Sequence, residues 1–423
     1  MIGEGRKMSV NAGDTSWVLM ATGLVMLMTP ALGFFYGGLV RKKNLSNTIM
    51  QCFAIFAVVG LVWTLWGYSL AFGPSIGGYI GNLDKVLLNN VGVTTVLPVQ
   101  YNAPGITELL YFAFELMFAA ITPALIVGAF AERIKFRSLL IFVILWSTIV
   151  YAPVAHWVWN PAGWIKTLGA IDFAGGTVVH ITAGVTALAA AIVVGPRIKR
   201  EKIEGKPSNV PYVILGAALL WFGWFGFNAG SALSASPIAV SAFVVTNLSA
   251  SAAAVSWMIM DTLVKGKPSA TGIAIGAVCG LVGITPASGF VTPASAIVIG
   301  LVAGVLSNLV STWRARTRLD DTLDVFACHG VSGIWGSIAT GLFATITVNS
   351  AGANGLFYGN PNQLLIQIEA VLAVIAFAFT VSFVLLKIVN RFSKLRVTPE
   401  EEEQGLDLSQ SGEEAYSSSD TAS

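Results

Sequence analysis

The chain has 423 residues, of which 55% are hydrophobic and only 11% are charged, and its mean hydropathy is +0.74. A soluble domain carries about 25% charged residues, so this composition excludes a soluble globular protein and indicates a polytopic membrane protein. The formal net charge of +2 gives no sign of a nucleic-acid partner, and the three cysteines all lie in apolar segments, where they form no disulfide framework.

Eleven apolar stretches are separated by charged or Gly/Pro-rich segments. Each has roughly 20 residues, enough for an α-helix to span a bilayer, so we expect an all-α fold with eleven transmembrane helices. The expected spans are 16–40, 46–72, 106–131, 136–158, 174–195, 211–230, 237–263, 270–288, 294–313, 326–348 and 363–390. A polar tail begins near Lys394, which divides the chain into a transmembrane domain, 1–393, and a cytoplasmic tail, 394–423.

Basic residues are distributed unevenly between the two sides of these helices. The segments after helices 1, 3, 5, 7, 9 and 11 hold 20 of the 24 Lys and Arg, and the other side holds Arg6, Lys7, Lys85 and Lys166. The positive-inside rule therefore predicts an N-terminus outside the cell membrane and a C-terminus in the cytoplasm. We do not interpret the N-terminal segment as a cleaved signal peptide, because a mostly polar stretch precedes an apolar run that is too long for one.

An odd helix count with this asymmetry is compatible with two inverted repeats. Helices 1–5 and 6–10 would form the repeats, with helix 11 peripheral. GFFYGG (33–38) loosely resembles GWFGFNAG (223–230), and an aspartate precedes a histidine in helices 5 and 10. The spacings differ, because Asp172 lies eight residues before His180 whereas Asp324 lies five residues before His329. Inverted repeats place functional residues near the bilayer midplane.

Two of the three histidines in the chain, His180 and His329, lie within long apolar segments and require an explanation. An ionisable ring in a membrane helix is costly unless it faces a protein interior or a water-filled path. His180 and His329 are therefore either hydrogen-bonded core residues or part of a conduction route. Cys328 does not make His329 a metal site, because neighbouring residues on a helix do not share a face and no third ligand converges. His156 ends helix 4, where a structural role is expected.

Aromatic residues form a second cluster. Phe114 and Phe118 lie one turn apart on helix 3, and Trp159 follows helix 4. Further rings crowd helix 6 just before Ser231. Aromatic residues at a membrane interface are commonly belt anchors. The alternative is a cation site, in which aromatic faces and a hydroxyl acceptor hold a small donor-rich cation.

Six motifs, in order along the chain, resemble the ammonium transporter (Amt/MEP/Rh) family and specifically its Amt branch. They are GFFYGGLVRKKN (33–44), MFAAITPALIVGAFAERIKF (117–136), DFAGGTVVHITAG (172–184), GWFGFNAGSA (223–232), GAVCGLVGITPASGFV (276–291) and DVFACHGVSGIWG (324–336). The resemblance implies an eleven-helix bundle of inverted repeats, a pore through each subunit, and a homotrimer.

The resemblance also implies roles for particular residues. The ammonium-recruitment site would comprise Trp159, Ser231, Phe118 and Phe114, with Thr285 in the outer vestibule. The stacked gate would be Phe118 and Phe227, and the pore would be lined by His180, His329 and Trp224. Asp172 would lie beneath the recruitment site, mainly as a helix cap, and Asp324 would have a structural role near the inner mouth.

Three features depart from the family pattern. Glu115 stands where a neutral amide is expected; it either faces the pore and attracts cations or lies at a subunit contact. Asn160 and Pro161 replace a glycine-rich turn after Trp159. Gln410 and Ser411, within GLDLSQSGEEAY (405–416), replace an acidic-and-histidine pair of the tail.

The function implied is ammonium uptake across the cell membrane. Ammonium would be recruited outside and deprotonated near the gate, and ammonia would pass the two histidines with accompanying proton movement. Two alternatives remain: a Rh-like passive ammonia or carbon dioxide channel, which needs no cation site, and an ammonium sensor, which the short tail disfavours. No enzyme is expected, because no nucleophile–base pair is apparent, and no cofactor or metal is expected. A cytoplasmic PII-type protein is a possible regulatory partner of the family.

Overall fold

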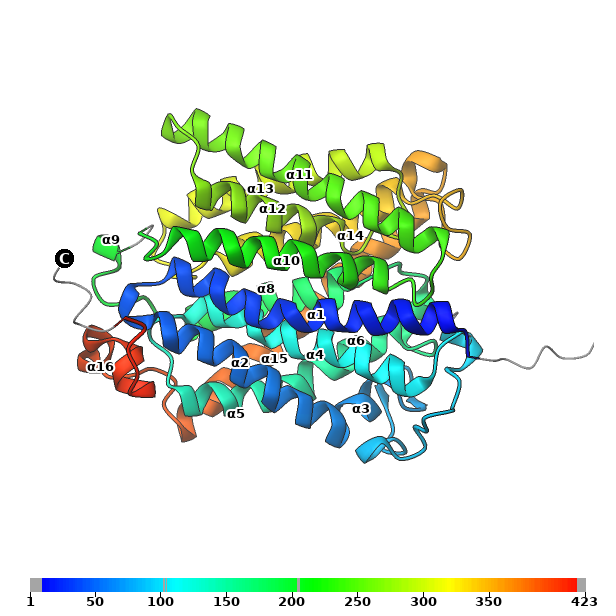
Figure 1. Cartoon of the computed structure of the whole chain (residues 1–423), viewed down its shortest axis with the longest axis horizontal. Coiled ribbons are helices and arrows are strands. Elements are labelled where there is room, and N and C mark those ends of the chain that lie inside the picture. The colour runs from blue at the N-terminus through cyan, green and yellow to red at the C-terminus, as the bar shows by residue number, and fades with distance from the viewer. Residues whose placement is uncertain (1–9, 102, 104, 204–205, 417–423) are drawn as a thin grey trace, which may run out of the picture.

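The computed structural model describes residues 10–101, 103, 105–203 and 206–416. Its helices run side by side along the long axis of the molecule (Figure 1). The α-helices are α1 (Ala12–Leu39), α2 (Leu45–Val62), α3 (Tyr68–Phe72), α4 (Glu108–Phe130), α5 (Phe136–Trp146), α6 (Ala152–Trp159), α7 (Trp164–Leu168), α8 (Thr182–Val194), α9 (Arg200–Ile203), α10 (Val210–Gly230), α11 (Pro237–Lys265), α12 (Ala270–Ile284), α13 (Pro293–Ala315), α14 (Ser332–Phe343), α15 (Pro361–Phe392) and α16 (Pro399–Gln404).

Shorter elements join or extend these helices. The π-helical segments are η2 (Trp63–Gly67), η5 (Ser147–Tyr151), η6 (Gly176–Ile181), η7 (Phe326–Val331) and η9 (Asp407–Ser411). The 3₁₀ segments are η1 (Lys42–Asn44), η3 (Val86–Leu88), η4 (Val99–Tyr101) and η8 (Leu356–Tyr358). Strands β1 (Ser75–Ile76) and β2 (Ile80–Gly81) pair antiparallel, with Ser75 opposite Gly81.

Each of the eleven expected spans corresponds to a helical segment. Within the described residues, nine segments are long and apolar enough to cross a membrane, α12 is shorter, and the segment 326–343 is not among the nine. The chain is therefore a multi-pass protein, and the count of eleven membrane crossings stays a prediction. Two spans were drawn too long, because α12 ends at Ile284 and α14 ends at Phe343.

Helix starts follow from local chemistry. Proline stands in the first turn of α10, α11, α13 and α15, where its missing N–H has no intrahelical partner to lose. The Thr292 side chain accepts a hydrogen bond from the backbone N–H of Ser295 and caps α13. These signals are readable in the sequence, which is why the expected spans begin close to the observed helices.

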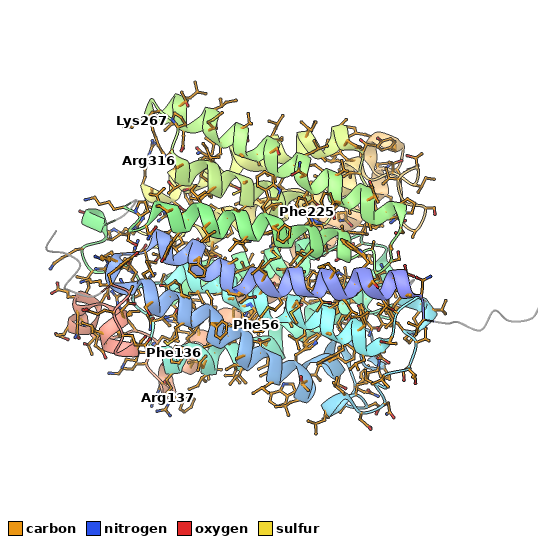
Figure 2. The ribbon with its side chains drawn as sticks, viewed as in Figure 1. Phe56, Phe136, Arg137, Phe225, Lys267 and Arg316 are labelled. Carbon is orange, nitrogen blue, oxygen red and sulfur yellow. The ribbon has the colours of Figure 1, made fainter. Side chains whose placement is uncertain are left out.

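The surface of the bundle is apolar along its length and basic at one end. Large hydrophobic side chains such as Leu61 and Leu263 are exposed, as expected of a surface that faces lipid rather than water. Arg137, Lys267 and Arg316 gather toward one end of the bundle, whereas Phe56 and Phe225 lie midway along it (Figure 2). The basic residues thus collect on one side, as their distribution in the sequence predicted.

The tail packs against this basic end of its own chain. The backbone N–H of Lys135 donates to the Leu395 carbonyl, and that of Val397 donates to the Arg133 carbonyl. Helix α16 follows at the same end, opposite the segment between α3 and α4 (Figure 1). The segment after Lys394 is therefore bound to the helical bundle and is not a separate, unattached tail.

Candidate functional site

A cavity of about 670 Å³, here called the vestibule, opens at the end of the bundle opposite the tail. It lies among the segments that follow α6, α10 and α14, which end at that side (Figure 1). Its lining includes Phe114, Glu115, Phe118, Trp159, Lys166, Asp172 and Ser231. The structure therefore brings together four of the five residues expected to recruit a cation, together with Asp172.

Two polar contacts fix the edge of the vestibule. The Trp159 indole N–H donates to the Asp172 carbonyl at 3.2 Å, which orients the ring. The Ser231 hydroxyl donates to the Phe227 carbonyl at 2.8 Å. Because the only hydroxyl proton of Ser231 is used in that bond, the lone pairs of its oxygen remain available to a donor-rich ligand.

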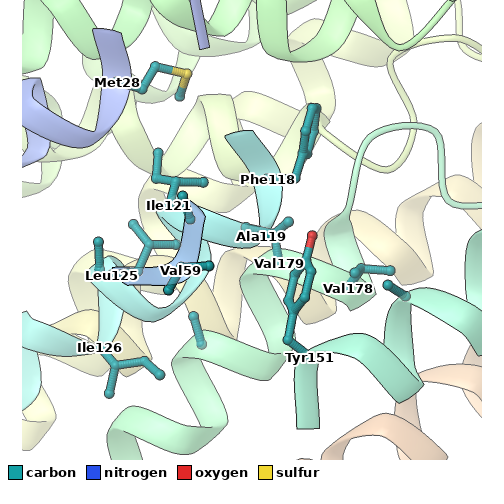
Figure 3. Close-up of a cluster of buried hydrophobic side chains, with 14 of the residues drawn as sticks. Met28, Val59, Phe118, Ala119, Ile121, Leu125, Ile126, Tyr151, Val178 and Val179 are labelled. Carbon is teal, nitrogen blue, oxygen red and sulfur yellow. The ribbon is translucent and has the colours of Figure 1, made fainter. Parts of the chain in front are cut away.

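Aromatic rings close the floor of the vestibule. The rings of Phe118 and Phe227 lie 4.3 Å apart between centroids and are tilted by 38°, and Phe118 meets Trp159 edge-on at 5.8 Å. Both phenylalanines are buried. Further along α4 from Phe118, Ile121 and Leu125 belong to the same cluster of buried apolar side chains (Figure 3). The expected gate pair is thus in contact, and it separates the vestibule from the interior.

Beneath these rings lies a second, very narrow cavity. It holds about 10 Å³ of space, close to the minimum that one water needs. Its polar lining comes from His180, His329 and Trp224, and the rest of its wall is apolar. The Trp224 ring stacks at 5.4 Å from the His180 ring. The lining of this cavity is therefore apolar apart from two imidazoles and an indole.

The two imidazoles contact each other directly. Nδ1 of His329 lies 3.3 Å from Nδ1 of His180, and the ring planes differ by 27°. A bond between two neutral rings at these atoms needs one proton, so one ring donates from Nδ1 and the other accepts. The donor ring then presents a bare Nε2 and its neighbour an Nε2–H. His180 Nε2 has no partner among the described residues. The pair can therefore accept or relay a proton.

Close backbone approach makes this contact possible. His180 lies in η6, which continues into α8, and His329 lies in η7, which continues into α14. A Cβ atom on Gly184 would lie 2.2 Å from the backbone nitrogen of Gly330. Only glycine at position 184 allows α8 and η7 to come this near. His180 lies one turn before Gly184 and His329 directly precedes Gly330, so this approach brings the two rings together.

Asp172 is occupied by its own helix. Its carboxylate accepts hydrogen bonds from the backbone N–H groups of Gly175 at 2.7 Å, Gly176 at 2.7 Å and Thr177 at 2.8 Å, and also from the Thr177 hydroxyl. These donors begin the π-helical turn that carries His180. The cap role that the sequence favoured for Asp172 is therefore visible in its contacts.

Before His329, it is Asp321 and not Asp324 that makes the contact which Asp172 makes before His180. Asp321 lies eight residues before His329, the spacing that separates Asp172 from His180. Its carboxylate accepts from the backbone N–H of Phe326 at 2.7 Å, at the start of η7. An aspartate, a π-helical turn and a histidine thus occur together at both His180 and His329.

Asp324 and Thr285 have other contacts. Asp324 forms an ion pair with Arg314, with Nε and Oδ1 2.5 Å apart, and accepts from the Ser311 hydroxyl at 2.8 Å. Thr285 is buried and does not line the vestibule; its hydroxyl accepts from the Trp224 indole N–H at 2.9 Å. Thr285 therefore orients the Trp224 ring and is not part of the vestibule lining, where the resemblance placed it.

His156 and Glu115 complete the polar residues singled out in the sequence. His156 is buried, with Nε2 2.7 Å from the Ser75 hydroxyl and Nδ1 2.8 Å from the Ala71 carbonyl. These contacts tie α6 to α3 and β1 and agree with a structural role. Glu115 lines the vestibule, so its position is neither lipid-facing nor remote from the aromatic cluster.

A buried ion network, which the sequence did not indicate, closes the opposite end. Glu132 pairs with Arg41 at 2.9 Å and with Arg197 at 3.1 Å, and Arg197 also pairs with Asp320 at 2.9 Å. Burial alone raises the pKa of Asp320, but hydrogen bonds and charge from Arg197, with the charge of Arg133, lower that pKa to about 2. These ion pairs join the four segments that follow α1, α4, α8 and α13.

Comparisons with known proteins place these features in a family. A model described as the Ammonium Transporter Family matches residues 16–416. The chain is 48% identical over 408 residues to an ammonium transporter of Bacillus subtilis (strain 168), covering 96% of this chain and 99% of that protein. It is 47% identical over 404 residues to the ammonium transporter Amt1 of Archaeoglobus fulgidus, covering 96% and 99%. The crystal structure of Saccharomyces cerevisiae Mep2 superposes with a TM-score of 0.88 at 38% identity, covering 98% of this chain and 93% of that one.

Proposed function

This chain belongs to the ammonium transporter family, a family of transporters and not of enzymes, and on that premise we propose how its own residues conduct ammonium. The ion is first held in the vestibule, over the rings of Phe118 and Trp159 and beside the Ser231 hydroxyl. A bare ion entering an apolar passage loses its hydration at a large cost in free energy. Aromatic faces and a free lone pair replace part of that hydration.

Deprotonation takes place at the gate formed by Phe118 and Phe227. Below it the passage is apolar and holds about one water-sized space. A neutral ammonia molecule fits such a route, and an ammonium ion with its hydration shell does not. Ammonium gives ammonia and one proton, and the proton passes to the imidazole pair, where an Nε2 lone pair accepts it and the bond between the two Nδ1 atoms relays it.

The observation that carries this proposal is the imidazole pair itself. Two buried histidines with their Nδ1 atoms 3.3 Å apart line an otherwise apolar cavity directly beneath a cation-compatible vestibule. A histidine pair with only a structural role would have its ring nitrogens hydrogen-bonded, whereas Nε2 of His180 has no partner among the described residues. A passive gas channel does not need the vestibule site.

The experiment is current measurement on purified protein in solid-supported membranes under ammonium and methylammonium pulses. Wild-type protein is expected to give a current that saturates with concentration. The double variant His180→Ala with His329→Ala is expected to lose that current, and an unchanged current would remove the proton relay. Ammonia flux without any current would favour the passive channel, and binding without flux would favour a sensor.

A second variant tests the vestibule. Trp159→Leu removes the aromatic face but leaves the histidine pair untouched. It is expected to weaken selection of ammonium over potassium, because the indole face that holds the cation beside the Ser231 oxygen is lost and only ammonium donates a hydrogen bond to that oxygen. Unchanged selectivity in Trp159→Leu would show that the recruitment site lies elsewhere.

The setting of the chain completes the proposal. We place the N-terminus outside the cell membrane and the transmembrane domain at 1–393, with the tail, 394–423, in the cytoplasm; the gathering of basic residues at the tail end supports this orientation (Figure 2). The working unit is a homotrimer. An exposed apolar groove that includes Trp17, Val240 and Phe243 supports contact with a second copy. A PII-type protein would act from the tail side.

A further inference from the structure

Among the described residues, three charged side chains line the vestibule: Glu115, Lys166 and Asp172. Asp172 is the obvious anion for a cation site, yet its two oxygens already accept four hydrogen bonds from residues 175–177. Its charge is therefore largely compensated by the donors that begin η6. Lys166 is exposed and carries the wrong sign to attract a cation.

Glu115 differs from Asp172 in its partners. It lies between Phe114 and Phe118 on α4, is 6% exposed, and borders the same cavity. Tyr111, about one turn before it on α4, lines the same cavity. The oxygen Oε2 is buried and has no hydrogen-bond partner among the described residues. A buried carboxylate with an unused acceptor is unfavourable unless an opposite charge or a donor comes near.

We infer that Glu115 supplies the anionic contact of the recruitment site and sets the affinity of the vestibule for ammonium and small alkylammonium ions. This inference rests on the proposed function. The cation lies over the ring of Phe118, and Glu115 on the neighbouring helical position provides the compensating charge. A cation in the vestibule then gains a contact that replaces part of its lost hydration, and the Glu115 carboxylate gains the partner that Oε2 lacks.

The contribution belongs to binding and not to conduction. Glu115 does not line the narrow cavity that holds His180 and His329, so its removal leaves the lower route unchanged. An ion held less tightly in the vestibule reaches half-saturation at a higher concentration, while the maximal rate is set further down. A purely structural role for Glu115 would instead lower the amount of active protein and hence the maximal rate.

The test is saturable uptake of radiolabelled methylammonium into proteoliposomes by the full chain and its variants. Glu115→Gln keeps the shape of the side chain and removes its charge. We expect the KM to rise about tenfold, the size of one charge–charge interaction in a partly solvated site, with the maximal rate within about twofold of wild type. Glu115→Asp retains the charge and is expected to restore most of the affinity.

The matched control is Asp84→Asn, which removes an exposed carboxylate outside the vestibule lining and is expected to leave the KM unchanged. Glu115→Met, which is uncharged and of similar length, replaces Glu115→Gln if the latter does not fold. An unchanged KM in a folded, uncharged variant overturns the inference, as does a fall in maximal rate alone. Wild-type protein without saturable uptake overturns the proposed function, and this inference with it.

Discussion

At the scale of single residues, two carboxylates in one vestibule differ in what their oxygens contact. Both Asp172 and Glu115 are visible in the sequence as acids near the aromatic cluster, but hydrogen-bond occupancy is not. Asp172 was interpreted mainly as a cap, and its four donors agree with that interpretation. The sequence left Glu115 undecided between the pore and a subunit contact, because a helical position alone does not say which neighbours surround it.

Asp172→Ala is predicted to destabilise the protein. The variant leaves the N–H groups of Gly175, Gly176 and Thr177 without an acceptor, and loss of a cap costs about 0.5–2 kcal/mol. Asp172→Asn retains one acceptor oxygen and should lie between the alanine variant and wild type. Thermal unfolding of the detergent-solubilised protein measures the order. Equal stability of all three proteins would contradict the cap role.

The neighbouring residues Asp320 and Asp321 are predicted to respond oppositely to pH. Burial and the charge of Asp324 raise the pKa of Asp321 to about 6, whereas the pKa of Asp320 is lowered to about 2. The ionised Asp321 therefore costs stability above pH 6, and this cost is relieved as the pH falls from about 6 toward 4. Ionised Asp320 contributes stability above about pH 4, and that contribution is lost as the pH falls toward 2.

Unfolding temperatures between pH 3 and pH 8 check this pair. Asp321→Asn should be more stable than wild type at neutral pH, and the difference should disappear toward pH 4. Asp320→Asn should be less stable by about 3 kcal/mol at neutral pH, because it breaks a buried ion pair, with the gap narrowing below pH 4. A difference that does not change with pH in either variant speaks against these assignments.

At the scale of elements, the sequence predicted the helices far better than their internal irregularities. Apolar length and first-turn prolines are local signals, so the spans were placed within a few residues, apart from the ends of α12 and α14. The π-helical turns η6 and η7 were not foreseen, because they depend on an aspartate several residues upstream and on tertiary packing. The sequence analysis considered only Asp324 before His329, and the contact of Asp321 with the start of η7 appears only in three dimensions.

Gly184→Ala is predicted to abolish most transport without preventing membrane insertion. The added Cβ would lie 2.2 Å from the Gly330 nitrogen, so α8 and η7 must separate and the histidine rings move apart. A displacement of about 1 Å in a reacting geometry can cost about a hundredfold in rate. Methylammonium uptake per folded protein measures the loss.

Gly23→Ala is the control, since a Cβ at Gly23 meets nothing within 4 Å. Helix propensity favours alanine at both positions by up to about 1 kcal/mol. Stability should therefore be maintained or raised in Gly23→Ala, with uptake unchanged. If both variants behave alike, close approach at Gly184 does not position the histidines.

At the scale of the whole molecule, the tail docks on the helical bundle of its own chain. The Asp407 carboxylate accepts hydrogen bonds from the backbone N–H groups of Asn47 at 2.7 Å and Ser46 at 3.2 Å, at the start of α2. Of the two residues that depart from the family's tail pattern, Ser411 accepts from the Asn47 amide at 2.8 Å and Gln410 accepts from the Phe136 backbone N–H at 3.3 Å. Gln410 and Ser411 therefore both bind the tail to the helical bundle, a role that their residue types alone did not reveal.

Asp407→Ala is predicted to loosen the tail. The buried Asn47 N–H and the part-buried Ser46 N–H lose their acceptor, at a cost of about 1–3 kcal/mol for the buried donor, so the segment around Lys394 and Arg396 should detach more often. Limited trypsin digestion followed by mass spectrometry measures the cleavage rate there. Gln404→Ala, at an exposed position of the same tail, should leave the rate at the wild-type value; equal rates in both variants would argue against the anchor.

The ion network at the tail end also sets an order of events during synthesis. Arg41, Glu132, Arg197 and Asp320 are made one after another as successive helices enter the membrane, but each remains incompletely covered while later segments are missing. Glu402, which accepts from the Ile198 backbone N–H and from Arg396, is translated last. These contacts are therefore complete only after the segment that carries Glu402 has been translated, and in a shorter nascent chain the Ile198 N–H and the Arg396 guanidinium lack this acceptor.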